Sequence, residues 1–326
     1  MTPGISAKNA RVLNRSALFI MKYPIFLLTV QLAVLSACTV SPVPQTDIDG
    51  LASVSRRETL RVMTFNILWQ GHDIESQFHD SDFALRKSLV LDVLTGFDAD
   101  IIGLQEASKE QRKALEPALS AFGMFPSSSQ PGDEFILYRL DRFRVIESGR
   151  ELLRVEPEIA GTNIGVRDFV WVHLHDRRNG KRFYVLNLHL DHRSSERGRQ
   201  LDGILLGKWI GQRSSADPVI MTGDFNGGPN MPRYLYLTGQ RAYIDKDGDA
   251  VRMPMPMLDT FTLAKPDETY SGTSNRGFSG RKNTKQIDYI FVPHGTKVID
   301  STIIYYNVDG SYPSDHFPLL SEFELE

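Results

Sequence analysis

Six short segments carry side chains that can bind a metal ion or move a proton. Each places Asn, Asp, Glu or His at or just after the end of an apolar, strand-like run; in chain order they are residues 64–68, 103–107, 187–192, 223–226, 286–290 and 314–318. Carboxylate, amide and imidazole groups of this kind suit a hard divalent cation and acid–base groups that act on a phosphate ester. The series therefore predicts one site assembled from several strand ends.

Taken alone, each segment also has an ordinary structural interpretation. Glu106 follows an apolar run, where a carboxylate is often exposed, and Asn66 has the position of a buried hydrogen-bonding residue. Residues 224–228 have the composition of a turn, and residues 315–316 are compatible with a simple loop. The whole series favours metal binding by Glu106. For Asn66, direct ligation and orientation of a ligand stay equally open, and Asp288 is a candidate partner for either His189 or His316.

Strands and helices that would position these groups alternate from residue 57 to the end of the chain. The expected strands are 60–66, 101–104, 134–138, 168–173, 183–190, 219–222, 287–292 and 298–306. Apolar residues at helical spacing predict helices over 83–95, 109–122 and 194–212, the last with Ser194 and Ser195 as capping residues. Strands mixed with helices, and charged residues at strand ends, predict a two-sheet sandwich flanked by helices.

Two glycine-containing segments affect the placement of the site. Asn179-Gly180 predicts a tight turn that pairs 169–175 with 183–190 antiparallel, which lifts His189 to the rim of a sheet. Residues 271–284 are rich in Gly, Ser and Asn but lack the spacing of a Walker phosphate-binding loop. We expect this segment to be a mobile loop beside the site.

The N-terminal part of the chain has the features of a secretory signal. A short basic start is followed by an apolar run that ends at Leu35-Ser36-Ala37-Cys38, which resembles the lipobox of bacterial lipoproteins. The run is shorter than the roughly 20 residues of a membrane span. We expect residues 1–37 to be a lipoprotein-type signal peptide, with Met21 as an alternative start.

The only cysteine of the chain, Cys38, would become the lipidated first residue of the mature protein. Residues 38–57 would then form the lipid attachment and a flexible tether, and residues 58–326 the folded domain. A single cysteine excludes a disulfide within the chain and a thiolate nucleophile in the domain. The predicted location is therefore outside the cytoplasm, anchored by lipid to a membrane of the bacterial cell envelope.

The charge balance bears on the substrate. The chain carries 37 basic and 40 acidic side chains, a net charge of −3. Residues 1–37 contain four basic and no acidic side chains, so the remainder has 33 basic and 40 acidic groups and a net charge of −7. A protein this acidic is poorly suited to coat a polyanion, so nucleic acid is not the favoured partner. A local basic groove at Arg193, Arg197 and Arg199 leaves it open.

The ordered set of segments resembles the endonuclease/exonuclease/phosphatase superfamily, which has the deoxyribonuclease-I-like fold. The most specific motifs are Gly223-Asp224-Phe225-Asn226, Ile287-Asp288-Tyr289-Ile290 and Ser314-Asp315-His316-Phe317-Pro318. The resemblance spans about residues 60 to 320. It implies an α/β (α+β) fold, a four-layer α/β sandwich of two mixed β-sheets flanked by helices. It also implies cleavage of a phosphoester with a divalent metal ion, Mg²⁺ or alternatively Mn²⁺.

The same resemblance implies roles for individual residues. Asp224 and Asn226 match the pair that positions water and stabilises the transition state. The full implied set comprises catalytic His189, Asp224, Asn226, Asp288 and His316, metal-binding Asn66, Glu106 and Asp315, and, by a weaker match, substrate-binding Arg167. Tyr270 stands where relatives often have the His of a Phe-His-Gly motif, so the role of that loop stays open.

These observations together predict a monomeric Mg²⁺-dependent phosphodiesterase. It would act on a small or lipid phosphoester by direct attack of water, with no covalent enzyme intermediate. A metal-dependent nuclease is the first alternative and requires a basic groove. A non-catalytic binding module on the same fold is the second, and it is disfavoured because none of the main catalytic positions is lost.

Overall fold

The structure is a computed structural model that describes residues 58–70, 82–153, 167–213, 217–268, 271–275, 277–282 and 284–326. The predicted signal peptide, lipid-bearing cysteine and tether lie outside these residues. Among the described residues, no helix combines the length and the apolar character needed to cross a membrane.

The first of two six-stranded sheets has the strand order β13-β14-β1-β2-β4-β3. β1 and β2 run parallel, and the other neighbouring strands run antiparallel. The strands are β1 (Leu60–Asn66), β2 (Ile101–Gln105), β3 (Phe122–Phe125), β4 (Phe135–Arg139), β13 (Lys297–Ile303) and β14 (Leu319–Glu324).

The second sheet has the order β11-β12-β8-β7-β6-β5, with β7 and β8 parallel and the remaining neighbours antiparallel. Its strands are β5 (Phe143–Leu153), β6 (Arg167–Asp176), β7 (Arg182–His189), β8 (Val219–Asp224), β11 (Met257–Asp259) and β12 (Asp288–Pro293). A separate hairpin contains β9 (Tyr243–Ile244) and β10 (Ala250–Val251). The predicted turn after Asp176 does join β6 and β7, and Gly180 adopts the positive φ of +76° that such turns require.

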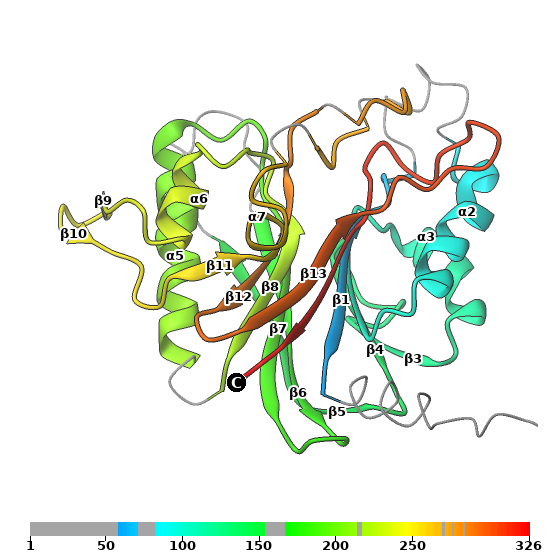
Figure 1. The fold of residues 1–326 in the computed structure, drawn as a ribbon, viewed down its shortest axis with the longest axis horizontal. Helices are drawn as coiled ribbons and strands as arrows, with labels where there is room; N and C mark the ends of the chain where they lie inside the picture. The colour runs from blue at the N-terminus through cyan, green and yellow to red at the C-terminus, as the bar shows by residue number, and fades with distance from the viewer. Residues whose placement is uncertain are drawn as a thin grey trace, which may run out of the picture. The chain divides into compact units, whose positions relative to one another are not determined.

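Helices cover the outer faces of both sheets, as Figure 1 shows. They are α2 (Phe83–Gly96), α3 (Lys109–Leu115), the 3-10 helix η1 (Glu116–Ala118), α5 (Glu196–Arg213) and α6 (Pro232–Leu237). The short helix α7 (Thr260–Ala264) instead contacts strands of both sheets, and its Phe261 belongs to the apolar cluster between them. One apolar cluster joins the first sheet to α2 and α3, a second fills the space between the sheets, and a third joins the second sheet to α5 and α6. These three interfaces define the predicted four-layer sandwich.

Local sequence explains where the two site-proximal helices begin and end. The Asp82 side chain accepts a hydrogen bond from the Ala84 amide at the start of α2, and Ser108 and Gln111 form a capping box on α3. The prediction of one helix over 109–122 is wrong in its second half. Pro117 has no amide hydrogen, so the chain tightens into η1 and then enters β3.

The strand directions bring all six chemically active segments to one edge of the sandwich, called here the site edge. The parallel pairs β1–β2 and β7–β8 end there, and the antiparallel neighbours β14 and β12 begin there. In register, Asp288 lies opposite Asp224, and Leu319 lies opposite Thr64. Thr64 and Leu319, 255 positions apart in sequence (319 − 64), are thereby placed side by side.

Candidate active site

The first sheet contributes an asparagine and a glutamate that contact each other. The Asn66 amide Nδ2 donates to Glu106 Oε1 at 3.0 Å and to Asp224 Oδ2 of the other sheet at 3.2 Å. The Asn66 oxygen accepts from the Leu68 amide at 3.0 Å, and Glu106 Oε2 accepts from the Trp69 amide at 3.0 Å. Asn66 is therefore held on all sides, and it fixes the orientation of the Glu106 carboxylate.

The backbone around these residues is strained. Leu68 and Glu106 both have positive φ angles, of 59° and 56°, and Asn226 of the second sheet has 47°. A non-glycine residue in this region costs on the order of 1–3 kcal/mol, and such residues cluster at functional sites. Three of them at one edge indicate that side-chain placement is maintained here against local backbone preference.

Asp224 lies at the centre of the site. Its Oδ1 accepts from the Asn226 amide at 2.8 Å. Its Oδ2 is 3.5 Å from His189 Nε2 and 3.8 Å from His316 Nε2, in addition to the contact with Asn66. One carboxylate oxygen thus faces an amide nitrogen and two imidazole nitrogens that come from three different strand ends.

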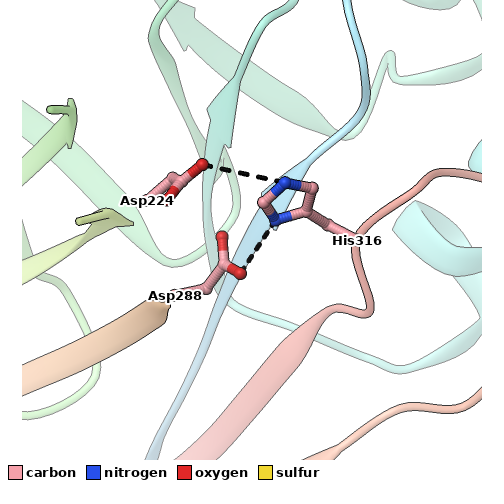
Figure 2. Close-up of side chains that lie close together, drawn as sticks. All are labelled: Asp224, Asp288 and His316. Carbon is pink, nitrogen blue, oxygen red and sulfur yellow. Dashed lines mark hydrogen bonds and ion pairs between the residues drawn. The ribbon is translucent and has the colours of Figure 1, made fainter. Parts of the chain in front are cut away.

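The structure resolves which histidine Asp288 contacts. Figure 2 shows the His316 ring between two carboxylates, with Nδ1 2.9 Å from Asp288 Oδ2 and Nε2 toward Asp224. Burial alone would lower the pKa of His316, but the charges of Asp288 and Asp224 outweigh it and raise the pKa well above its usual value. His316 is therefore an imidazolium at neutral pH.

His189 has a different environment. Burial lowers its pKa in spite of the nearby Asp224 and Glu106 carboxylates, which keeps the ring neutral. The Asn226 amide lies 2.9 Å from His189 Nε2 and also donates to the Leu190 carbonyl at 2.9 Å. Both Asn226 N–H groups are thus occupied, so this side chain orients His189 rather than pointing a free donor at a substrate.

The carboxylates of the site differ in protonation. Burial acts against ionisation of Glu106, but the His189 ring and the hydrogen bonds from Asn66 and Trp69 outweigh it, so its pKa lies below the usual value. Burial and the adjacent Asp288 raise the pKa of Asp224. Glu106 is therefore a stable anion, whereas Asp224 is shifted in the direction that suits a proton acceptor near neutral pH.

The remaining two predicted residues are Asp315 and Arg167. Asp315 is half-buried and has the Ser314 hydroxyl 3.3 Å from its Oδ1, and burial raises its pKa with help from Glu106. Arg167 begins β6 and forms an ion pair of 3.4 Å with Asp191, two residues beyond His189. Its positive charge is near enough to contribute to the lowered pKa of His189.

The site has the composition expected of a cation-binding centre. Four carboxylates face only two imidazoles, and Asp288 Oδ1 is buried without a hydrogen-bond partner among the described residues. Asp224, Asp288 and His316 each offer a ligand atom, and these atoms lie within 4.8 Å of one another. The imidazolium already lies between these two carboxylates, so Glu106, which carries a stable negative charge, is the better anchor for a metal ion.

Two residues that support the site were not predicted. The Ser314 hydroxyl donates to the Asn66 carbonyl at 2.7 Å and accepts from the His316 amide at 3.1 Å, which joins β1 to the segment before β14. Arg86, fully buried on α2, donates to the Ile67 and Pro313 carbonyls at 2.8 and 2.6 Å. The sequence signal for Ser314 was its place in the Ser-Asp-His motif; for Arg86 it was an arginine on the apolar face of a helix.

The glycine-rich segment does lie beside the site. The Thr273 hydroxyl accepts from the Asp288 amide at 3.1 Å, and the Thr273 carbonyl accepts from the Phe317 amide at 2.6 Å. The Asn275 amide donates to the Asp315 carbonyl at 2.7 Å. These bonds attach the segment to both Asp288 and the Asp315-His316 pair. Its predicted mobility stays a prediction.

A family model for the Endonuclease/Exonuclease/phosphatase family matches residues 63–316, from β1 to the histidine before β14. The chain belongs to this family. Members of the family are hydrolases that act on phosphoester bonds and generally depend on a divalent metal ion, and this chain keeps the acidic and imidazole groups such chemistry needs. A comparison with curated protein sequences finds no match.

Solved structures share the fold at low sequence identity. A family protein from Bacteroides vulgatus is 24% identical, with a TM-score of 0.67 over 82% of this chain and 99% of its own. The mannosyl-6-phosphatase of Bacteroides thetaiotaomicron is 23% identical, with a TM-score of 0.67 over 82% and 100%. The human Nocturnin catalytic domain is 21% identical, with a TM-score of 0.62 over 83% and 96%. These similarities identify the deoxyribonuclease-I-like sandwich and leave the substrate of this protein open.

Proposed function

We propose that this protein is a Mg²⁺-dependent phosphodiesterase that hydrolyses a small phosphoester by direct attack of water, with Mn²⁺ as the alternative ion. The observation that carries the proposal is the convergence of Glu106, Asp224 and His316 at one edge: Asn66 donates to both Glu106 and Asp224, and Asp224 Oδ2 lies 3.8 Å from His316 Nε2. Glu106 is ionised, His316 is an imidazolium, and Asp224, with a raised pKa, lies between donor groups. Such a set can hold a cation, accept a proton and stabilise an anion at the same time.

Glu106 and Asp315 are the carboxylates that would hold the ion. Asn66 already uses its oxygen and both N–H groups within the protein, which favours orientation of Glu106 over direct ligation. When bound, Mg²⁺ would polarise a phosphoryl oxygen and stabilise charge on the leaving oxygen. Mg²⁺ commonly uses only one or two protein carboxylates and keeps several waters, which agrees with this small ligand set.

The remaining groups accept the proton of the attacking water and stabilise the charge on the phosphate. Asp224 Oδ2 orients the attacking water and accepts its proton. His316, held by Asp288, presents Nε2–H to the phosphoryl oxygens, and neutral His189 is kept in place by Asn226. Water itself is the attacking group, so the proposal needs no covalent enzyme intermediate.

A cavity next to the site supports an ester with a compact organic group. It has a volume of about 630 Å³ and begins at Gly228 and Gln286, each two residues from the catalytic Asn226 or Asp288. Tyr234 and Phe261 form part of the apolar wall of the cavity, and Asn230 and Lys285 are among the polar residues that line it. Cavities of this size typically hold small ligands.

The nuclease alternative receives less support because the arginines of the candidate basic groove are already engaged. Arg193 donates to both oxygens of Asp191, at 3.2 and 3.1 Å, and Arg167 contacts the same carboxylate. Arg197 donates to the Asp245 carbonyl at 2.6 Å, and Arg199 to the His192 carbonyl at 2.9 Å. Each of these arginines thus already bonds to a carboxylate or carbonyl of the protein, although the Arg193 side chain is 52% exposed.

A substrate panel tests the proposal directly. The full-length protein in detergent is assayed on bis(p-nitrophenyl) phosphate, p-nitrophenyl phosphorylcholine, a hexose 6-phosphate, a long-chain phospholipid and plasmid DNA. We expect turnover of small diesters with Mg²⁺ or Mn²⁺, none with EDTA, and a shallow dependence on salt. Efficient and strongly salt-sensitive digestion of DNA would establish the nuclease alternative instead. Full turnover in metal-free buffer would overturn the mechanism.

The location of the protein is a separate proposal that rests on Leu35-Ser36-Ala37-Cys38. We expect wild-type protein in the membrane fraction with a lipid label, and Cys38→Ser protein either unprocessed or released. Fractionation with metabolic fatty-acid labelling measures both. A Cys38→Ser protein that is still labelled and membrane-bound would refute lipid attachment at this residue.

A further inference from the structure

A layer of buried polar side chains connects the two sheets directly beneath the site. Its members are Thr64 and Gln105 of the first sheet and Asn187 and Thr222 of the second, all with 0% exposure. Farther from the site the sheets meet through an apolar cluster. Polar groups in such an interior are costly unless they are hydrogen-bonded, so a layer of them at this level needs a reason.

Asn187 is the member that joins the sheets. Its Nδ2 crosses from β7 to two carbonyls of the first sheet, Leu104 at 2.7 Å and Phe135 at 3.2 Å. Its Oδ1 accepts from Gln105 Nε2 at 2.6 Å and from the Thr222 hydroxyl at 3.0 Å. All the hydrogen-bonding capacity of this amide is used, and three of the four bonds reach the opposite sheet.

The layer has a fixed relation to the catalytic groups. Side chains two residues apart on a strand point to the same face. Three members of the layer lie two residues before a site residue: Asn187 before His189, Thr222 before Asp224, and Thr64 before Asn66. The fourth member, Gln105, directly precedes Glu106. It also donates to the Thr64 hydroxyl at 3.0 Å. The layer therefore lies one step below the site on β1, β2, β7 and β8, and within it Asn187 and Gln105 form the hydrogen bonds between the two sheets.

Gly103 shows how closely the sheets approach at this level. A Cβ atom at this position would lie 2.2 Å from the Thr222 hydroxyl oxygen and 2.5 Å from Asn187 Oδ1. Both atoms belong to the polar layer, which leaves no space for any side chain at residue 103. The layer thus sets a short separation between the sheets that only glycine permits.

We propose that Asn187 is a positioning residue that fixes the separation and register of the two sheets, and with them the geometry between Glu106 of one sheet and Asp224 of the other. Directional hydrogen bonds resist sliding of one sheet over the other, whereas apolar contacts alone tolerate it. The inference rests on the proposed function only for its kinetic readout. The geometric readout, the 3.2 Å contact between Asn66 and Asp224, is independent of it.

The test compares Asn187→Ala with Ser321→Ala. Ser321 is also fully buried, and it joins the first sheet to the second through Thr260, whose hydroxyl donates to the Ile290 carbonyl at 3.0 Å. It lies opposite Val62, well below the site. Both variants remove a buried hydrogen-bonding group, so both are expected to lower the melting temperature, but only Asn187 is predicted to position the catalytic groups.

Calorimetric titration with Mn²⁺ and steady-state kinetics on a small diester separate the two roles. Loss of a group that orients metal ligands typically weakens metal affinity about 10- to 100-fold, and a displacement of about 1 Å can lower turnover about 100-fold. We expect effects of this order in Asn187→Ala, mainly in kcat, with KM little changed. For Ser321→Ala we expect Mn²⁺ affinity and kcat within about twofold of wild type because Ser321 touches no group that orients the ligands. Equal effects of the two variants on Mn²⁺ affinity would overturn the proposal.

Two further measurements keep the outcome decisive. If Asn187→Ala does not fold, Thr222→Val removes one bond to Asn187 at constant side-chain size and should show a smaller effect in the same direction. If the wild-type protein binds no Mn²⁺, the proposed function fails. The positioning role is then decided by a crystal structure of Asn187→Ala, in which an unchanged contact between Asn66 and Asp224 would refute it.

Discussion

The two edges of the sandwich carry charged clusters of opposite character. At the edge away from the site, Arg142 is fully buried, and each of its three side-chain nitrogens donates to a carboxylate. Nε and Nη2 reach Asp176 at 2.9 and 2.7 Å, and Nη1 reaches Asp100 at 2.7 Å. At the site edge, four carboxylates face two imidazoles, and Asp288 Oδ1 has no partner among the described residues.

The two clusters differ in whether the charged and hydrogen-bonding groups find partners within the protein. The Arg142 cluster satisfies its donors within the fold, so it contributes to the native state without any ligand. The site cluster keeps an excess of negative charge and three residues with positive φ, both of which oppose folding. We therefore expect substitutions at the site edge to lower activity and substitutions at the opposite edge to lower stability.

The largest expected effect is on turnover at the site edge. Asp224→Asn removes the proton acceptor while it keeps the shape of the side chain, and losing a general base typically lowers kcat by about 10²–10⁴. The free energy of unfolding should not fall, because burial and the adjacent Asp288 already oppose the ionised form of Asp224. Single-turnover kinetics and chemical denaturation measure the two quantities on the same sample.

Mn²⁺ affinity serves as the control for that prediction, since Glu106 is unchanged in the Asp224→Asn protein. A variant as active as the parent on the true substrate would remove Asp224 from the mechanism. A large loss of stability would instead show that the site edge resembles the opposite edge, and the contrast between the two clusters would disappear.

The second prediction concerns the opposite edge. Arg142→Leu leaves the buried Asp176 and the partly buried Asp100 without their cation, and breaking a buried pair in this way costs roughly 3–5 kcal/mol of unfolding free energy. Activity per folded molecule should stay at the parental level. Lys297→Ala, which breaks a 3.3 Å surface pair with Glu324, is the matched control and should change stability little. If Arg142→Leu lowered kcat at unchanged folded fraction, the two edges would have to be coupled.

Much of this architecture could be predicted from the sequence because many of the strands are short apolar runs that end at polar or turn-forming residues. The predicted strand 60–66 matches β1 in full, and the turn at Gly180 appears where Asn-Gly placed it. The long strand β5 and the short strand β3 were not predicted. β5 lies at the edge of its sheet, and its exposed residues include both charged and apolar side chains, so it has no clear apolar–polar alternation. β3 begins at Phe122, the last residue of the predicted helix.

The geometry of the site was harder to predict from the sequence than the identity of its residues. The family resemblance named His189, Asp288 and His316, yet only the register between β12 and β8 and the position of the segment before β14 show that Asp288 contacts His316. The role of Asn187 could not be predicted, because its four partners lie on three different strands, β2 and β4 of one sheet and β8 of the other. Contacts of this kind depend on tertiary packing and leave no local pattern in the sequence.

The smallest expected effect is a pH dependence of stability at the site edge. Glu134 directly precedes β4, is 6% exposed, and makes no ion pair with the described residues. Burial, with the charges of Asp168 and Asp133, raises its pKa from 4.5 to about 8. Between these values the folded protein holds a proton that the unfolded chain has released, so the contribution of Glu134 to stability decreases as the pH rises through this window.

Glu134→Gln keeps the shape of the side chain and removes the titration. We expect similar melting temperatures for wild type and variant near pH 4.5 and a difference that grows toward pH 8, where the variant is the more stable protein. Glu110→Gln, at an exposed position of α3, is the control and should leave the pH profile of wild type unchanged. Parallel profiles for wild type and Glu134→Gln would mean that this carboxyl group ionises normally. Glu134 would then be a further anion at the site edge near neutral pH, and the excess of negative charge there would be larger than described above.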